Sequence, residues 1–210
     1  MVLEGKIASG PEFSHCTGEK RLFKLMIRAE RKSGIIDTVP VLVGEELLNG
    51  TDYYEGMAVR ITGNFRSVNR TENGKRKLIL YLFAASIRRS RGENGDKNFV
   101  SMEGYICREP TYRTTPSGME ITDLLIAVNR PYHRADYNPC ICWSDNAAKA
   151  GRLPVGTRVE LKGRIQSREY VVHDNGEEIT RTAYELSIYY IDEVRDDEDE
   201  GFDDIRRKTG

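Results

Sequence analysis

Residues 56–63, GMAVRITG, are matched one hundred positions later by residues 156–163, GTRVELKG. The match extends outward, because residues 4–7, EGKI, return as residues 103–106, EGYI. An Asn-Gly pair late in the first half also returns in the second, at an offset of 102 residues. Since the order is kept and the offset drifts only from 99 to 102 residues, the chain contains two copies of one domain that differ by small loop insertions.

Each copy has the pattern of a small β-barrel. Apolar residues alternate with polar or outward positions over 39–43 and over 59–62, which is the two-residue period of a half-buried strand, and the Asn-Gly pairs predict hairpins. One short helix per copy fits between the third and fourth strands, over 45–49 and over 146–150. About five strands and one helix per copy fit the five-stranded OB-fold best. We therefore predict an all-β chain of two tandem OB-fold barrels, with one short helix in each copy.

The repeat sets the domain boundaries. We predict the first OB-fold over 1–90, a linker over 91–98 that is rich in charge and turn formers, and the second OB-fold over 99–193. Residues 194–210 are too acidic to be buried, and we predict a disordered tail there.

The charge of the chain is unevenly distributed. From Asp192 to the end there are nine acidic and four basic side chains, a balance of −5, so the remaining 191 residues carry +4 of the net −1. A basic body with an acidic tail favours a polyanionic partner. The apolar runs are only strand-length, the first residues lack the pattern of a signal peptide, and none of the four cysteines forms a C-x-x-C pair. These features predict a cytoplasmic protein with reduced thiols and no association with membranes.

Strand parity assigns side chains to the two faces of the barrel. Cys140 and Cys142 share the parity that Val39, Val41 and Val43 occupy in the first copy, so we expect both cysteines to be buried as small apolar residues. The alternative is a metal site, since C-x-C places both sulfur atoms on one side, but no nearby Cys or His completes four ligands. We predict no metal and no cofactor.

The outward-facing positions of these strands hold aromatic and basic residues. Candidate contacts of the second copy are the outward-facing aromatic and basic residues Tyr137, Trp143, Lys162, Arg164, Arg168 and Tyr170. Interleaved cations and exposed rings suit single-stranded nucleic acid, because the cations follow the phosphates and the rings stack on bases. The alternative is an ordinary solvated face on which the rings pack against neighbouring loops.

The first copy keeps the cations and loses these rings. Gly44 stands at the counterpart of Trp143 and Arg70 at that of Tyr170, while Arg66 and Arg70 remain as candidate contacts with the phosphate backbone. We predict that the second copy does most of the stacking and that the first adds backbone attraction, a dimerisation surface, or both.

The second copy resembles the bacterial single-stranded-DNA-binding protein family. Residues 109–118, EPTYRTTPSG, resemble the D-P-E-x-R-x-T-P-S-G segment of that family, and the resemblance continues through 126–130 and 163–170 to about Ile191. The first copy shares this resemblance only through the internal repeat. Two copies in one chain resemble the tandem members, which carry two OB-folds per chain and pair as dimers.

The resemblance implies roles for named residues. Tyr137, Trp143 and Tyr170 would stack on bases, and the segment from Arg130 and Tyr132 to Asp136 would be a DNA-contacting hairpin. The family ends in an acidic tip that docks replication and repair proteins. The residues that resemble this tip are Phe202, Asp203, Asp204 and Ile205. Here a basic run begins directly afterwards, at Arg206, which puts docking in doubt because the family's tip uses its terminal carboxylate; the alternative is a solubilising tail.

The resulting hypothesis is a non-enzymatic protein that coats single-stranded DNA and protects it during replication, recombination and repair. It would act as a homodimer of four OB-folds, in the bacterial cytoplasm and associated with the nucleoid. One alternative is a primosome or recombination accessory protein of the same fold. Another is an OB-fold nuclease, which would need clustered carboxylates for a metal ion, whereas Asp37 and Asp136 stand beside turns. A protein-interaction module that does not bind nucleic acid is disfavoured by the basic face with its exposed rings.

Overall fold

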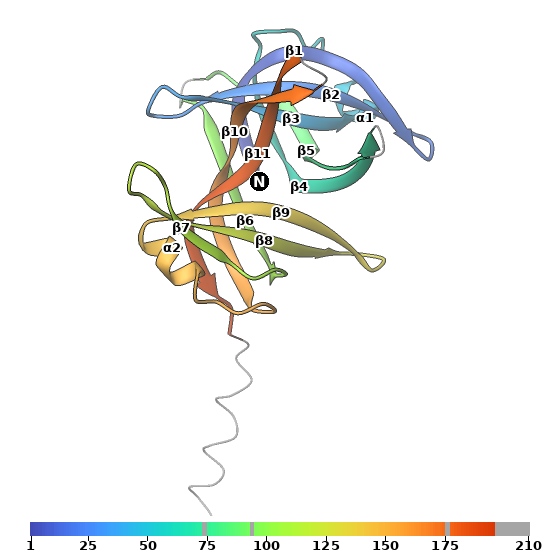
Figure 1. The fold of residues 1–210 in the computed structure, drawn as a ribbon. Helices are drawn as coiled ribbons and strands as arrows, with labels where there is room; N and C mark the ends of the chain where they lie inside the picture. The colour runs from blue at the N-terminus through green and yellow to red at the C-terminus, as the bar shows by residue number, and fades with distance from the viewer. Residues whose placement is uncertain (73–74, 93–94, 175–176, 196–210) are drawn as a thin grey trace, which may run out of the picture.

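Five strands and a short helix form the first barrel of the computed structural model, which describes residues 1–72, 75–92, 95–174 and 177–195 (Figure 1). The pairing order β1-β2-β3-β5-β4-β1 closes the sheet on itself. Strands β3 and β5 are parallel and the other neighbours are antiparallel. The elements are β1 (Val2–Thr17), β2 (Lys20–Glu30), β3 (Ile36–Gly44), α1 (Glu45–Leu48), β4 (Ala58–Glu72) and β5 (Lys75–Arg89).

The second barrel repeats this architecture. Its strands close in the order β6-β8-β9-β11-β10-β6, with β9 and β11 parallel and the short β7 added at the edge of β8. The elements are β6 (Lys97–Ile106), β7 (Thr111–Thr114), β8 (Glu120–Arg130), β9 (Arg134–Trp143), α2 (Asp145–Ala150), β10 (Arg158–Asp174) and β11 (Glu177–Glu193). The prediction of an all-β chain of two OB-fold barrels, each with one short helix, is confirmed. Strand β6 begins inside the segment expected to be linker. Within the described part of the chain, no helix combines the length and apolar character needed to cross a bilayer.

Repeated glycines explain why the matched segments are so similar. A Cβ atom on Gly63 would lie 2.1 Å from the carbonyl oxygen of Phe83, and one on Gly163 would lie 2.4 Å from that of Ser187. Both glycines follow a register shift, one in the β4–β5 pair and one in the β10–β11 pair. Only a residue without a side chain allows the two backbones to approach this closely, so the same bulge is built into both barrels.

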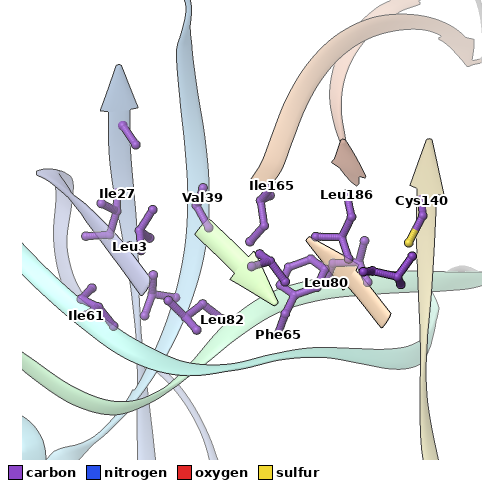
Figure 2. Close-up of a cluster of buried hydrophobic side chains, with 14 of the residues drawn as sticks. Leu3, Ile27, Val39, Ile61, Phe65, Leu80, Leu82, Cys140, Ile165 and Leu186 are labelled. Atoms are coloured by element: carbon purple, nitrogen blue, oxygen red, sulfur yellow. The ribbon is translucent and has the colours of Figure 1, made fainter. Parts of the chain in front are cut away.

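One continuous apolar core runs through both barrels. Val39, Val41 and Val43 are fully buried, and Cys140 and Cys142 are buried as predicted. Figure 2 shows the core side chains of the first barrel, including Phe65 and Leu80, together with Ile165 and Leu186 of the second. The two copies therefore share buried surface.

The two barrels are joined edge to edge by their first strands. β1 and β6 pair antiparallel, with Val2 opposite Phe99 and Leu3 opposite Asn98. The N-terminus lies between the barrels (Figure 1), and its ammonium group donates to the carbonyl oxygen of Gly63 at 2.9 Å. Consequently the pairing of the two copies begins at the first residues of the chain.

Two reciprocal pairs of hydrogen bonds complete the junction. Asp37 Oδ1 accepts the backbone N–H of Ser167 at 3.1 Å, and Ser167 Oγ accepts the backbone N–H of Thr38 at 3.0 Å. With the copies exchanged, Asp136 Oδ1 accepts the backbone N–H of Ser67 at 3.1 Å. Ser67 Oγ in turn accepts the backbone N–H of Tyr137 at 2.6 Å. The two copies are thus related by a pseudo-twofold rotation, and the β10–β11 hairpin lies beside β3 of the first barrel (Figure 1).

Candidate nucleic-acid interface

The register of β9, β10 and β11 creates an outer face on the second barrel. Leu186 of β11 is buried and lies opposite Cys140 of β9, so the neighbouring residues Ser187 and Trp143 point outward. Arg164 of β10 pairs with Ser187 and shares this face. The indole N–H of Trp143 donates to Ser187 Oγ at 3.1 Å, which keeps the ring against the sheet and leaves it half-buried.

A groove of about 420 Å³ opens over this face. It combines two aromatic residues, two side-chain amides and two guanidinium groups, which are the kinds of group that hold an unpaired base and its phosphate. The second copy supplies most of the lining, and one residue comes from the first copy. The principal lining residues are Trp143, Asn146, Arg164, Gln166, Tyr189 and, from the first copy, Arg31.

The two arginines of the groove differ in their partners. Arg31 donates from Nε and Nη2 to the two carboxylate oxygens of Asp37, at 2.7 and 2.6 Å. Arg164 Nε is buried and has no hydrogen-bond partner among the described residues. Burial lowers the pKa of Arg164 and the positive charge of Arg31 lowers it further, while Asp37 opposes this shift. Arg164 thus brings a positive charge to the groove and keeps one buried N–H donor without a partner among the described residues.

A second groove, of about 1040 Å³, begins at the same two arginines and extends over the first barrel. Lys6, Arg28 and Lys32 line it, together with four acidic side chains. Arg31 and Arg164 line both grooves, so the junction of the two barrels is a cationic crossing point between them.

The β8–β9 turn holds the residues expected to form a DNA-contacting hairpin. Tyr132 is 90% exposed and adopts a φ of 64°. Arg130 is held instead by an ion pair, with Nη1 donating to Asp136 Oδ1 at 2.9 Å. Tyr137 is 41% exposed, and its backbone is bonded to Ser67 of the first copy. Tyr132 is thus the most exposed ring of this segment, while the Arg130 side chain and the Tyr137 backbone are held at the junction.

The remaining predicted contacts of the second copy lie along β10. Lys162 forms an ion pair with Glu160 at 2.9 Å, and its Nζ lies 4.6 Å from the centre of the Tyr190 ring. The hydrogen bond to Glu160 raises the pKa of Lys162. Arg168 and Tyr170 are exposed on the part of the β10–β11 hairpin that projects beyond the barrel. Only Trp143 and Arg164 of the predicted set lie together in the groove.

The first copy is richer in rings than we expected. Tyr81 and Phe83 of β5 are half-exposed on the outer face, and the guanidinium carbon of Arg66 lies 5.1 Å from the centre of the Phe83 ring. The counterparts of Trp143, Tyr137 and Tyr170 are indeed not aromatic, but the comparison covered only the third and fourth strands and therefore did not include the rings of β5. Arg70 lies in β4, but its side chain is not among those that the structure describes. The predicted docking tip, Phe202 to Ile205, lies wholly outside the described residues.

The sequence analysis did not predict three residues that the structure places at or beside the groove. Arg31 reaches the groove only because the two copies pack together, which no local pattern reveals. Tyr189 and Tyr190 are both exposed because the β10–β11 register shifts at this point, which breaks strict alternation. The adjacent tyrosines, which cannot both be buried in a regular strand, are the signal that could have been used.

The described residues offer no metal-binding cluster of three or more His, Cys, Asp or Glu side chains. Burial raises the pKa of Cys142 to about 12 and also raises that of Cys140. Both thiols therefore remain protonated at neutral pH, whereas metal binding requires thiolates. They serve as small apolar core residues.

Comparison with known proteins shows that the second copy is similar to one family. The sequence model described as "Single-strand binding protein family" matches residues 97–192. The single-stranded DNA-binding protein of Halalkalibacterium halodurans is 36% identical over 87 residues, covering 38% of this chain and 50% of the relative. The single-stranded DNA-binding protein 1 of Staphylococcus aureus is 34% identical over 80 residues, covering 35% of this chain and 48% of the relative. The chain thus spans about half the length of the curated relatives it matches, and these relatives are named for DNA binding and not for catalysis.

The likeness of fold extends over both copies. The crystal structure of wild-type single-stranded DNA binding protein from Thermus aquaticus superimposes with a TM-score of 0.74 at 18% sequence identity. The alignment covers 93% of this chain and 92% of that one. The tandem arrangement of two barrels therefore has a solved counterpart.

Proposed function

We propose that the chain is, through residues 97–192, a member of the single-strand binding protein family and that it binds single-stranded DNA without cleaving it. The observation that carries the proposal is the groove in which Trp143 lies beside Arg164 and Arg31. A ring that stacks on any base and cations that pair with phosphate give binding that tolerates sequence. The physiological role we propose is protection of single strands during replication, recombination and repair in the bacterial cytoplasm.

The proposed contacts fall into two groups. Trp143 and Arg164 form the centre; Arg130, Tyr132 and Tyr137 belong to β8, β9 and the turn between them, and Lys162, Arg168 and Tyr170 follow β10. Arg31 and Arg66 extend the contact to the first copy. We propose that the strand follows the cationic crossing point from one barrel to the other.

Binding is expected to prefer single strands and to weaken with salt. Each phosphate contact releases counterions, so the logarithm of affinity should fall linearly with the logarithm of salt concentration, with a slope of about −0.7 per contact. Titration of poly-dT with the fluorescence of Trp143, repeated with a duplex of equal length, measures both properties. The same mixtures, with labelled DNA and Mg²⁺, should show no cleavage products. Equal affinity for duplex, or an affinity independent of salt, would contradict the proposal.

We propose that two chains associate, which gives an assembly of four OB-folds. Both long hairpins expose apolar side chains that a second chain would cover. These are Val68 and Leu78 in the first copy and Val171 and Ile179 in the second. Light scattering coupled to gel filtration should give twice the 23.9 kDa mass of one chain. A mass of one chain at micromolar concentration would show that the tandem barrels act alone.

The acidic end of the chain is proposed as a second binding element. Residues 194–210 lie almost wholly outside the described residues, so their role rests on composition. We propose that Phe202, Asp203, Asp204 and Ile205 contact replication or repair proteins.

A further inference from the structure

The pseudo-twofold rotation relates the Trp143 groove to a region of the first copy that also holds a ring and arginines, although Asn64 stands there at the position of Arg164. Leu82 lies opposite Val41 in the first barrel as Leu186 lies opposite Cys140 in the second. The residue after Leu186 is Ser187, against which the indole of Trp143 rests. The residue after Leu82 is Phe83. An aromatic ring therefore stands in the first copy at the strand position where the second copy has the serine.

In the first copy, the position that corresponds to Trp143 holds no aromatic residue. Its counterpart is Gly44, and a Cβ atom there would lie 2.4 Å from Glu46 Oε1. The carboxylate of Glu46 thus occupies the space beside Gly44, while the ring of this copy projects from β5 instead of β3. The aromatic group has moved by one strand and has not been lost.

Arg66 of β4, two residues beyond Asn64, supplies a cation on this face. Its guanidinium carbon lies 5.1 Å from the centre of the Phe83 ring, and its Nε is buried with no hydrogen-bond partner among the described residues. Arg164 in the second copy has an equally unpartnered Nε. In both copies, a half-buried ring therefore lies on the same outer face as an arginine with unused hydrogen-bonding capacity.

The other copy contributes a second arginine in both cases. Arg31 lines the Trp143 groove and is held there by Asp37, which also accepts the Ser167 N–H. Arg130 is held in the same way by Asp136, which also accepts the backbone N–H of Ser67, the residue directly after Arg66. Arg130 is the counterpart of Arg31 in the repeat. The pseudo-twofold rotation that relates the copies therefore places Arg130 near Arg66, as it places Arg31 in the Trp143 groove.

We propose that Phe83, Arg66 and Arg130 form a second stacking site, which takes an unpaired base and its phosphate on the first copy. A base stacks on the ring or on the guanidinium plane above it, and a phosphate oxygen accepts from the arginines. This site rests on the proposed function, and it gives one chain two stacking sites, related by the pseudo-twofold rotation. The nearby carboxylate of Glu46 makes it the weaker of the two, because it repels phosphate.

Moving the tryptophan tests this site directly. In the Trp143→Phe/Phe83→Trp variant, the only tryptophan stands in the first copy, and saturating oligo-dT should quench its fluorescence strongly. The matched control is Trp143→Phe/Phe13→Trp. Phe13 is 56% exposed and also has an arginine over its ring, Arg21 at 5.5 Å, but it lies on the β1–β2 hairpin and should be quenched far less. Absence of quenching at position 83, or equal quenching at both positions, would overturn the second site.

A further variant covers the case in which the exchanged tryptophan disturbs folding. Phe83→Leu keeps an apolar side chain without a π-face, and titration monitored by Trp143 should show fewer nucleotides bound per chain at saturation. An unchanged number of bound nucleotides would count against the site. If the wild-type Trp143 signal itself does not respond to DNA, the proposed function fails. A wild-type response combined with a silent position 83 refutes only the second site.

Discussion

Trp143→Ala is expected to weaken binding of single-stranded DNA about tenfold or more. Stacking of a base on an aromatic side chain is generally worth about 1–3 kcal/mol, because every base offers a π-face to the ring. Trp143 lies in the groove with Arg164 and Arg31, so the loss of its ring removes the centre of the site. Competition of each variant for a labelled oligo-dT measures the affinity without depending on the tryptophan.

Two comparisons separate stacking from folding. Trp143 is half-buried, so its replacement should cost less stability than the roughly 2–5 kcal/mol of a large core truncation. Tyr112→Ala removes a ring that is 46% exposed on β7, away from the groove, and should leave affinity unchanged. A Trp143→Ala protein that unfolds but retains affinity in its folded fraction would place the ring in the core and contradict the interface.

The two barrels could be predicted because the internal repeat provides two versions of the same strand pattern. A single alternating segment leaves the buried face undecided, but Val39, Val41 and Val43 identify the core parity that Cys140 and Cys142 then follow. The short helices were predictable for the same reason, since both copies leave the same gap between the third and fourth strands. Agreement between the two copies thus indicated which face of each strand is buried and where each short helix lies, which a single copy would have left undecided.

The contacts that join the two copies could not be predicted from the repeat or from local sequence patterns. Asp37 and Asp136 stand beside turns, where aspartate commonly bonds to its own backbone, and nothing local indicates that each instead accepts an N–H from the other barrel. Arg31 is part of the groove only through this packing. The aromatic residues of β5 were missed because only the third and fourth strands were compared, and the correspondence of Phe83 to Ser187 becomes visible only once the pairing with β3 and β9 is known. Contacts between distant segments, and not local patterns, complete the site.

Asp37→Ala should destabilise the protein by about 3–5 kcal/mol, the usual cost of removing one partner of a buried ion pair. The carboxylate is fully buried, and it accepts both Arg31 hydrogen bonds and the Ser167 N–H. Its removal leaves a guanidinium group and a backbone donor without a partner at the junction of the barrels. Urea denaturation followed by circular dichroism measures the change in the free energy of unfolding.

The pseudo-twofold relation provides the matched control for this prediction. Asp136→Ala removes the equivalent carboxylate, but Arg130 donates only one hydrogen bond of 2.9 Å to it, so the loss of stability should be smaller. Arg31→Ala combined with Asp37→Ala removes the unpaired charge, and the double variant should lose less than the sum of the single losses. Because Arg31 lines the Trp143 groove, folded Asp37→Ala should also bind oligo-dT more weakly, whereas Asp136→Ala should leave the Trp143 groove intact. Equal and small losses for the two aspartates would mean that the barrels are held by their shared apolar core and the β1–β6 pairing alone, and that Arg31 keeps its place in the groove without Asp37.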